Sequence, residues 1–153
     1  YLTQTSEDSQ ETSIKSFDLA TGEHADVCAG YAFDLHGDLM AVAEDGAATR
    51  FSIYNLADGT STSICEDQDV VDFVWDVSGK AVYYIVYRDT EGEESYPMAL
   101  YRYDLENATS TAIMDMVSGA LYPASGEDAC VMVYIYTQRR EAVPASYRIS
   151  MLP

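Results

Sequence analysis

The sequence predicts an all-β chain built from repeated four-stranded antiparallel sheets, and three observations support this. Two short motifs alternate along the chain in a fixed order. Thirteen tyrosines and many valines, isoleucines and threonines suit the pleated surface of a sheet. No stretch keeps apolar residues at helical spacing over three turns. With 48% apolar residues, the chain of 153 residues can bury a core.

The two motifs define an internal repeat. The first is an apolar or aromatic residue followed by Asp or Asn, Leu and a cluster of turn residues, and it occurs at 16–23, 53–60 and 102–109. The second places an aromatic residue four positions before a glycine, followed by a strand-like run, and it occurs at 33–37, 75–79 and 122–126. Its glycines are 42 and then 47 residues apart, a period typical of repeat architectures.

Each repeat is expected to form four short strands, which we name a to d in chain order. In the best-preserved repeat these strands are expected at 70–76, 81–88, 99–104 and 109–114. Four strands in about 40 to 50 residues, separated by turns, are typical of a β-propeller blade. The aromatic residue of the second motif (Phe33, Trp75 or Tyr122) is expected to pack between neighbouring blades.

The repeats predict a single β-propeller segment over residues 1–153, with two complete and two partial blades. The expected boundaries are 1–28 (partial), 29–66, 67–115 and 116–153 (partial). The first unit is expected to lack strand a and the last to lack strand d. Unpaired sheet edges associate readily with other strands. We therefore expect a protein partner, another propeller segment or a second copy of the chain to cover them, unless the chain is part of a longer protein.

The stretch 75–85, Trp-Asp-Val-Ser-Gly-Lys-Ala-Val-Tyr-Tyr-Ile, resembles the repeat of TolB-like propellers. In that repeat an aromatic residue, a turn of the Ser-Pro-Asp-Gly-Lys type and an apolar strand follow one another. The turns at Asp18 and Asp104 are similar to its turn between strands c and d. The resemblance implies binding or scaffold duties outside the cytoplasm, or the gating propeller of an enzyme similar to prolyl oligopeptidase. A fold alone does not decide between these functions.

The net charge of −18 restricts the partners, because 26 acidic residues face only eight basic ones. Such a surface repels phosphate backbones and anionic lipids, so we expect no binding of nucleic acid. The apolar runs are too short to cross a bilayer, so we expect no membrane insertion within this chain. The charge fits either a generally soluble protein or one in a salty or extracellular setting. Together with the resemblance, it predicts a secreted, periplasmic or cell-surface location.

No catalytic or cofactor-binding pattern stands out, so the chain is predicted to be non-catalytic and to need no cofactor or metal. The strained turn Gly-x-Ser-x-Gly, which exposes the nucleophile of many hydrolases, does not occur. Cys28 and Cys65 lie at equivalent positions of successive repeats, too far apart for a disulfide, and Cys130 lies in a strand b. All three are expected to be free thiols that pack as small apolar residues.

One acidic run has two interpretations. Residues 66–69, followed by Asp72, offer carboxylates that could bind calcium. They lack the alternating acidic order and the distal glutamate of a helical calcium loop. The absence of these features favours the second interpretation, a solvated loop.

The candidate binding site follows from the strand order. Antiparallel strands place the a–b and c–d turns at one edge of each sheet, which we call the turn edge. The b–c hairpins and d–a connections lie at the opposite edge, which we call the loop edge. Long loops on a rigid scaffold often carry function. The candidate residues all come from the loop edges: Glu44, Asp45, Glu66, Asp67, Asp69, Asp89, Glu91, Glu93, Glu94, Tyr96, Arg139 and Arg140.

Two functions remain open from the sequence. The first is a non-catalytic binding or scaffold module that presents its loop edges to a protein partner. The alternative is the propeller part of a prolyl-oligopeptidase-like hydrolase whose catalytic domain lies outside this sequence.

Overall fold

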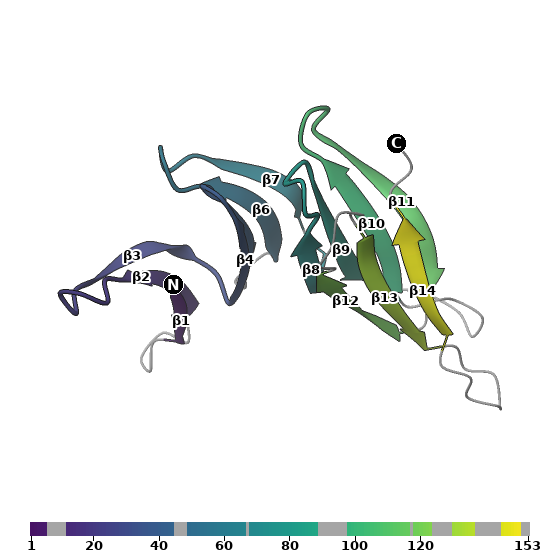
Figure 1. Ribbon diagram of the computed structural model, residues 1–153, viewed down its shortest axis with the longest axis horizontal. Coiled ribbons are helices and arrows are strands. Elements are labelled where there is room, and N and C mark those ends of the chain that lie inside the picture. The colour runs from purple at the N-terminus through teal and green to yellow at the C-terminus, as the bar shows by residue number, and fades with distance from the viewer. Residues whose placement is uncertain are drawn as a thin grey trace. The chain divides into compact units, whose positions relative to one another are not determined.

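The computed structural model describes residues 1–5, 12–44, 49–66, 68–88, 98–116, 118–123, 130–136 and 145–150. From Pro123 onward it describes the backbone alone. These residues form 14 strands and no helix (Figure 1). The strands make four separate sheets, in each of which sequence neighbours pair antiparallel. The chain divides into two compact units, Tyr1–Asp67 and Gln68–Pro153.

The first unit contains two sheets. The first sheet has the strand order β1 (Leu2–Thr5), β2 (Thr12–Phe17), β3 (His24–Ala29). The second sheet has the strand order β4 (Ala32–His36), β5 (Leu39–Glu44), β6 (Arg50–Asn55), β7 (Ser61–Glu66).

The second unit also contains two sheets. The third sheet comprises β8 (Val70–Trp75), β9 (Ala81–Tyr87), β10 (Met98–Asp104) and β11 (Thr109–Met116), paired in that order. The fourth sheet comprises β12 (Ser118–Pro123), β13 (Cys130–Tyr136) and β14 (Ala145–Ser150), also paired in order.

The predicted all-β architecture of four-stranded antiparallel blades is confirmed. The four strands of the third sheet begin and end within two residues of the expected positions. That the four sheets make a single propeller segment with the expected boundaries stays a prediction.

The first motif is the turn between strands c and d. In the first and second sheets the side-chain Oδ1 of Asp18 or Asn55 accepts the backbone N–H two residues later, at 2.7 and 2.9 Å. Gly22 and Gly59 then adopt φ angles of +77° and +74°, a region where a side chain is disfavoured. Each glycine N–H donates to the carbonyl of the Asp or Asn, at 2.8 Å. The first motif therefore supplies the hydrogen bonds and, in these two sheets, the glycine conformation that form the c–d turn.

A bulge recurs in strand d of three sheets, and the sequence motifs do not signal it. The register shifts leave Val27, Ile64 and Ile113 without a direct partner. The residue after each bulge is Cys28, Cys65 or Met114, and it pairs with a fully buried residue of strand c: Ile14, Phe51 or Leu100. Cys28 and Cys65 therefore occupy equivalent positions in the strand register of their sheets.

Within the first unit, the first and second sheets pack through Ile14, Met40 and Val42. All three are at most 1% exposed. Gly30 lies in the connection between these sheets with a φ of +151°. A Cβ at this position would lie 2.6 Å from Val42 Cγ1 and 3.0 Å from Ile14 Cδ1. The close approach of the two sheets thus requires glycine here.

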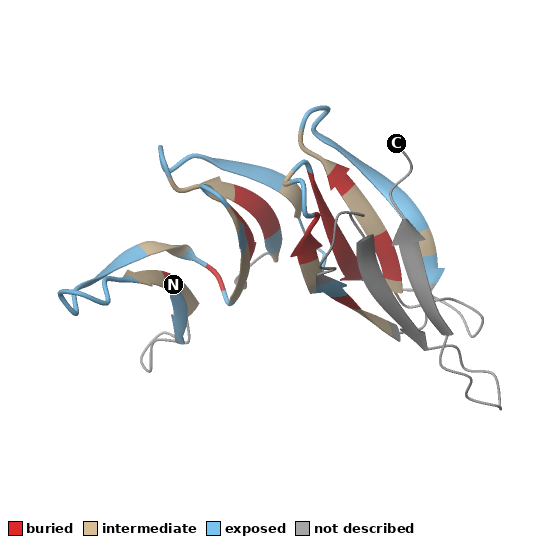
Figure 2. Cartoon of the chain, in the orientation of Figure 1, coloured by how far each residue is buried: buried red, intermediate tan, exposed pale blue. Residues whose placement is uncertain are grey.

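Within the second unit, β8 and β9 of the third sheet pack against β12, and buried positions gather on β8 and β9 (Figure 2). Tyr83, Ile85 and Leu100 are buried together with Leu121 of β12. The Leu121 N–H donates to Oδ2 of Asp72 at 2.7 Å, and the Phe73 N–H donates to its Oδ1 at 2.9 Å. The Asp72 carboxylate therefore joins the two sheets, a role that the calcium interpretation had not considered.

The aromatic positions of the second motif behave differently from one another. Trp75 is buried and Phe33 packs against the core of the first unit, as predicted. Tyr122, however, is 50% exposed. The expectation of a buried aromatic residue is therefore not met at Tyr122. Leu121, on the opposite side of β12, is the residue buried against the third sheet.

Candidate functional site

The described residues include three members of the predicted loop-edge site: Glu44, Glu66 and Asp69. The other members lie outside the described residues: Asp45, Asp67, Asp89, Glu91, Glu93, Glu94, Tyr96, Arg139 and Arg140. The candidate site therefore consists of the described residues at the strand ends along the loop edges.

In the second sheet, register brings two of the acidic residues to the same arginine. Arg50 pairs with Glu44 of β5 on one side and with Glu66 of β7 on the other. Its Nε lies 3.6 Å from Oε1 of Glu66. Glu44 accepts a hydrogen bond of 3.2 Å from the hydroxyl of Ser52, which is fully buried. At this edge Arg50 is therefore ion-paired with Glu66, while the carboxylate of Glu44 is hydrogen-bonded to Ser52.

The third sheet has a second arginine at its loop edge. Arg88 Nη1 lies 2.7 Å from Oδ1 of Asp115, and Nη2 donates to the Tyr101 hydroxyl at 2.9 Å. The Tyr101 hydroxyl and then Asp115 raise the pKa of the Arg88 guanidinium. Tyr101 also stacks on Tyr84, with ring centroids 5.4 Å apart. This arginine is therefore held firmly at the edge.

Sequence reasoning missed both Arg50 and Arg88. It looked for charge in the loops, whereas these residues lie in or directly after a strand. The signal that would have found Arg50 is strand register, because Glu66 lies directly opposite it after the bulge of strand d. Asp115 occupies the equivalent position but lies opposite Ala99, and Arg88 reaches it from the end of strand b.

Asp69 contrasts with these paired residues. Its backbone carbonyl accepts the Tyr87 N–H at 2.8 Å, which fixes the start of the third sheet. Its side chain is exposed and has no ion pair with any described residue. Asp69 is therefore a loop-edge carboxylate that is rigidly placed and accessible to a partner.

The cysteines at Cys28 and Cys65 are free, as predicted, while Cys130 lies outside the residues with described side chains. Burial, and then the nearby negative charge of Glu44, raises the pKa of Cys28 to about 11. Burial raises the pKa of Cys65 to about 11 as well. Both thiols therefore stay protonated at neutral pH and are poor nucleophiles. The described part of the chain also contains no group of three His, Cys, Asp or Glu side chains placed to hold a metal.

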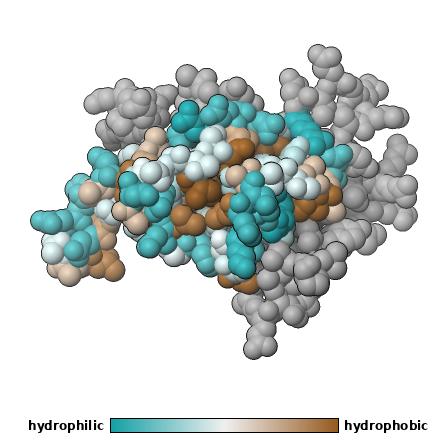
Figure 3. Space-filling view, turned by 90° about the horizontal axis from the view of Figure 1, so that it is seen from above, coloured by the Kyte–Doolittle hydropathy of each residue, from teal (hydrophilic) through white to brown (hydrophobic). Residues whose placement is uncertain are grey.

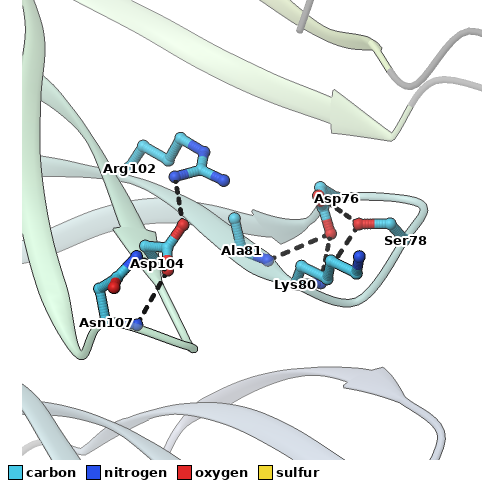
Figure 4. Close-up of polar contacts among 7 residues, drawn as sticks. All are labelled: Asp76, Ser78, Lys80, Ala81, Arg102, Asp104 and Asn107. Carbon is cyan, nitrogen blue, oxygen red and sulfur yellow. Dashed lines mark hydrogen bonds and ion pairs between the residues drawn. The ribbon is translucent and has the colours of Figure 1, made fainter. Parts of the chain in front are cut away.

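The turn edge of the third sheet carries an open groove of about 360 Å³, a feature that the sequence did not predict. Its charged lining residues are Lys80, Arg102, Asp104 and Glu106. Arg102 and Asp104 form an ion pair of 2.9 Å, and the Asn107 backbone N–H also donates to Asp104 at 3.0 Å (Figure 4). These contacts lower the pKa of Asp104, with the Asn107 hydrogen bond as the largest cause. The central charges of the groove therefore neutralise each other.

Comparison with known proteins places the fold and no more. No protein-family model and no curated protein matches this chain. A solved structure of the acylaminoacyl peptidase from Pyrococcus horikoshii is similar over 97% of the chain, with a TM-score of 0.59 and 12% sequence identity. The chain spans only 30% of the length of that protein. At this identity the likeness supports the β-propeller fold, while the resemblance to TolB-like repeats stays a prediction.

Among the described residues, no helix is long and apolar enough to span a membrane. Hydrophilic side chains cover much of the described surface that is visible in Figure 3.

Proposed function

We propose that this chain is a non-catalytic binding module, outside the cytoplasm, that presents the loop edges of its blades to a basic protein partner. The observation that carries the proposal is the accessible carboxylate of Asp69, held at the loop edge by the Asp69–Tyr87 backbone hydrogen bond. Glu66 lies at the loop edge of the second sheet and is exposed as well. A net charge of −18 attracts cationic partners and speeds their association.

A pair of charge reversals tests where a basic partner binds. The first variant combines Glu66→Lys with Asp69→Lys at the loop edges. The matched control combines Asp38→Lys with Glu106→Lys, which lie at the turn edges of the same two sheets and are exposed. Both variants change the net charge by the same amount, and Arg50→Gln in the otherwise unchanged chain controls for the loss of the Glu66–Arg50 ion pair.

Binding to a lysine-rich peptide is then measured by isothermal titration calorimetry at low salt. We expect the loop-edge variant to lose about tenfold in affinity and the control about twofold or less, since short-range complementarity adds to the general field. Equal losses in the two variants would mean that only net charge matters, and would contradict the proposal. Fractionation of the source cells with an antibody against the chain tests its location.

The second candidate function is the propeller part of a peptidase. The specific observation in its favour is the structural similarity to the acylaminoacyl peptidase. Reading the gene beyond both ends of this sequence separates the two candidates. A hydrolase domain in the same reading frame would favour the peptidase, and its absence would favour the binding module.

A further inference from the structure

The open groove of about 360 Å³ at the turn edge of the third sheet is built from two turns that are fixed to each other. Its lining comes from the a–b turn, the end of strand c and the c–d turn: Gly79, Lys80, Arg102, Asp104, Leu105 and Glu106. The Leu105 N–H donates to the Lys80 carbonyl at 3.0 Å, so the two turns are joined. The Lys80 N–H donates to the buried carboxylate of Asp76 at 2.9 Å (Figure 4). The backbone of the groove is therefore organised before any ligand arrives.

The charged side chains of the groove divide into one neutralised pair and two single charges. Arg102 and Asp104 form an ion pair of 2.9 Å, and Asn107 donates to Asp104 through its backbone N–H and its side-chain amide, each at 3.0 Å. Lys80 and Glu106 are exposed, and neither forms an ion pair with any described residue. The groove thus offers one accessible positive charge and one accessible negative charge.

The second sheet shows that the fold does not require this pattern of charges. Both sheets join their a–b and c–d turns by the same backbone hydrogen bond, from the N–H of a leucine to the carbonyl of the residue before strand b. By this bond and by strand register, Lys80, Arg102 and Glu106 correspond to Asp38, Ile53 and Ala57. Two of the eight basic residues of a chain with a net charge of −18 therefore line this groove, at positions where the sister sheet has none. A ligand explains them better than the backbone does.

We propose that this groove binds a small zwitterion of short-peptide size, with the ligand carboxylate at Lys80 and the ligand ammonium at Glu106. The net charge of −18 opposes the approach of a simple anion, and Lys80 opposes the seating of a simple cation. A zwitterion has no net charge, so only the two local charges select it. The volume of the groove falls within the range of about 300–1,000 Å³ that is usual for small-molecule sites.

This site lies at the turn edge, so the inference is independent of the function proposed at the loop edges. A lysine-rich peptide that is blocked at both ends has no carboxylate to place at Lys80. The groove therefore adds little to the binding of such a peptide, because a single exposed ion pair with Glu106 contributes little.

Two-dimensional NMR of the isotope-labelled chain tests the proposal, with diglycine as the probe. We expect saturable shifts that centre on the amides of the two turns, with a Kd of about 1–10 mM, because exposed ion pairs are weak. N-acetyldiglycine keeps only the carboxylate and diglycinamide keeps only the ammonium. Each is expected to bind about three- to fivefold more weakly than diglycine. Free glycine carries both charges on a shorter chain and is expected to bind more weakly as well.

Substitutions that remove one charge at a time locate the binding. Lys80→Gln and Glu106→Gln should each weaken diglycine binding by about three- to fivefold. Asp38→Asn is the matched control, because Asp38 is exposed at the equivalent turn of the second sheet and the net charge changes as it does in Glu106→Gln. This control should leave diglycine binding unchanged. All three side chains are exposed, and the same spectra show whether each variant is folded.

Four results would overturn the proposal. The first is the absence of a saturable shift with diglycine, and the second is diglycine binding that survives Lys80→Gln or Glu106→Gln. The third is equal binding of a blocked form: diglycinamide would then be gathered by net charge alone, and N-acetyldiglycine would identify an anion site. The fourth is glycine binding more tightly than diglycine, which would contradict a ligand of peptide size.

Discussion

The second sheet (β4–β7) and the third sheet (β8–β11) share strand order and bulge position, yet their turns are stabilised differently. At the a–b turn of the second sheet, His36 pairs with Leu39 around Gly37, whose φ is +59°. In the third sheet the last pair before this turn is Trp75 with Val82, and the buried Asp76 accepts three hydrogen bonds from the turn that follows it. The two repeats therefore close the same pair of strands with a tight turn in one case and a longer, carboxylate-anchored turn in the other.

The c–d turns differ as well. The second sheet uses Asn55 and Gly59, whereas the third uses Asp104 and Ala108. Ala108 has a φ of +50°, which is uncommon for a residue with a side chain. The repeat thus keeps an Asp or Asn acceptor and a left-handed residue at the c–d turn, although the residue types differ between the two sheets. Each sheet therefore depends on different residues for its stability.

The largest predicted difference between the sheets is at the a–b turn. Asp76 accepts the Ser78 hydroxyl at 2.8 Å and the backbone N–H groups of Lys80 and Ala81 at 2.9 and 3.2 Å. Asp76→Ala leaves these donors without their acceptor, so we expect a loss of about 2–3 kcal/mol in the free energy of unfolding. Asp38→Ala, at an exposed position of the tight turn in the second sheet, should cost about 0.5 kcal/mol or less.

Urea unfolding followed by circular dichroism measures both variants, and the fluorescence of Trp75, the single tryptophan, reports on the third sheet. Asp76→Asn keeps an acceptor oxygen and serves as the conservative control, with an intermediate loss. Losses of the same size for Asp76→Ala and Asp38→Ala would show that the Asp76 carboxylate does not stabilise its turn more than an exposed turn residue does.

The next prediction concerns the left-handed residue of the c–d turn. Gly59→Ala should destabilise the second sheet by about 1 kcal/mol through backbone strain. Steric crowding does not add to this, because the nearest heavy atom to a Cβ at Gly59 is the Tyr54 hydroxyl oxygen at 3.4 Å. Ala108→Gly relieves the same strain in the third sheet and should be neutral or stabilising by up to about 1 kcal/mol.

Thermal unfolding of the two single variants measures this pair. Opposite signs are expected, since the two substitutions exchange the same residues at equivalent turns. A destabilising Ala108→Gly would mean that the alanine side chain contributes contacts that outweigh its backbone strain.

The turns also show what could be predicted from the sequence. The Asp-Leu and aromatic-glycine motifs predicted the sheets because they carry the Asx turns and glycine conformations on which the strands depend. The bulges at Val27, Ile64 and Ile113 were not predicted, since a bulge is a property of pairing between strands and has no residue signature here. Strand order alone correctly assigned Glu44, Glu66 and Asp69 to the loop edges. The ion pair of Glu66 with Arg50 became visible only from the strand register.

The smallest predicted effect is on the pH dependence of stability. It arises because the c–d turn has Asn55 in the second sheet and Asp104 in the third. The Asn107 N–H and Arg102 lower the pKa of Asp104 in the folded chain from its usual value of 3.8. A carboxylate with a depressed pKa stabilises the fold above that value and loses this contribution as the pH falls through the folded pKa. Asn55 makes its hydrogen bond at every pH, because an amide does not titrate in this range.

Asp104→Asn should therefore flatten the loss of stability of the chain below about pH 4, where the carboxylate protonates. Asn55→Asp should steepen it, because a carboxylate at that turn would accept the same Ala57 N–H and have a lowered pKa. Asp18, whose pKa the Ala20 N–H lowers, remains in both variants and gives a common background. Urea midpoints between pH 7 and pH 3 measure the slopes. Parallel slopes for the two variants would show that the turn carboxylates are too exposed for their protonation to affect folding.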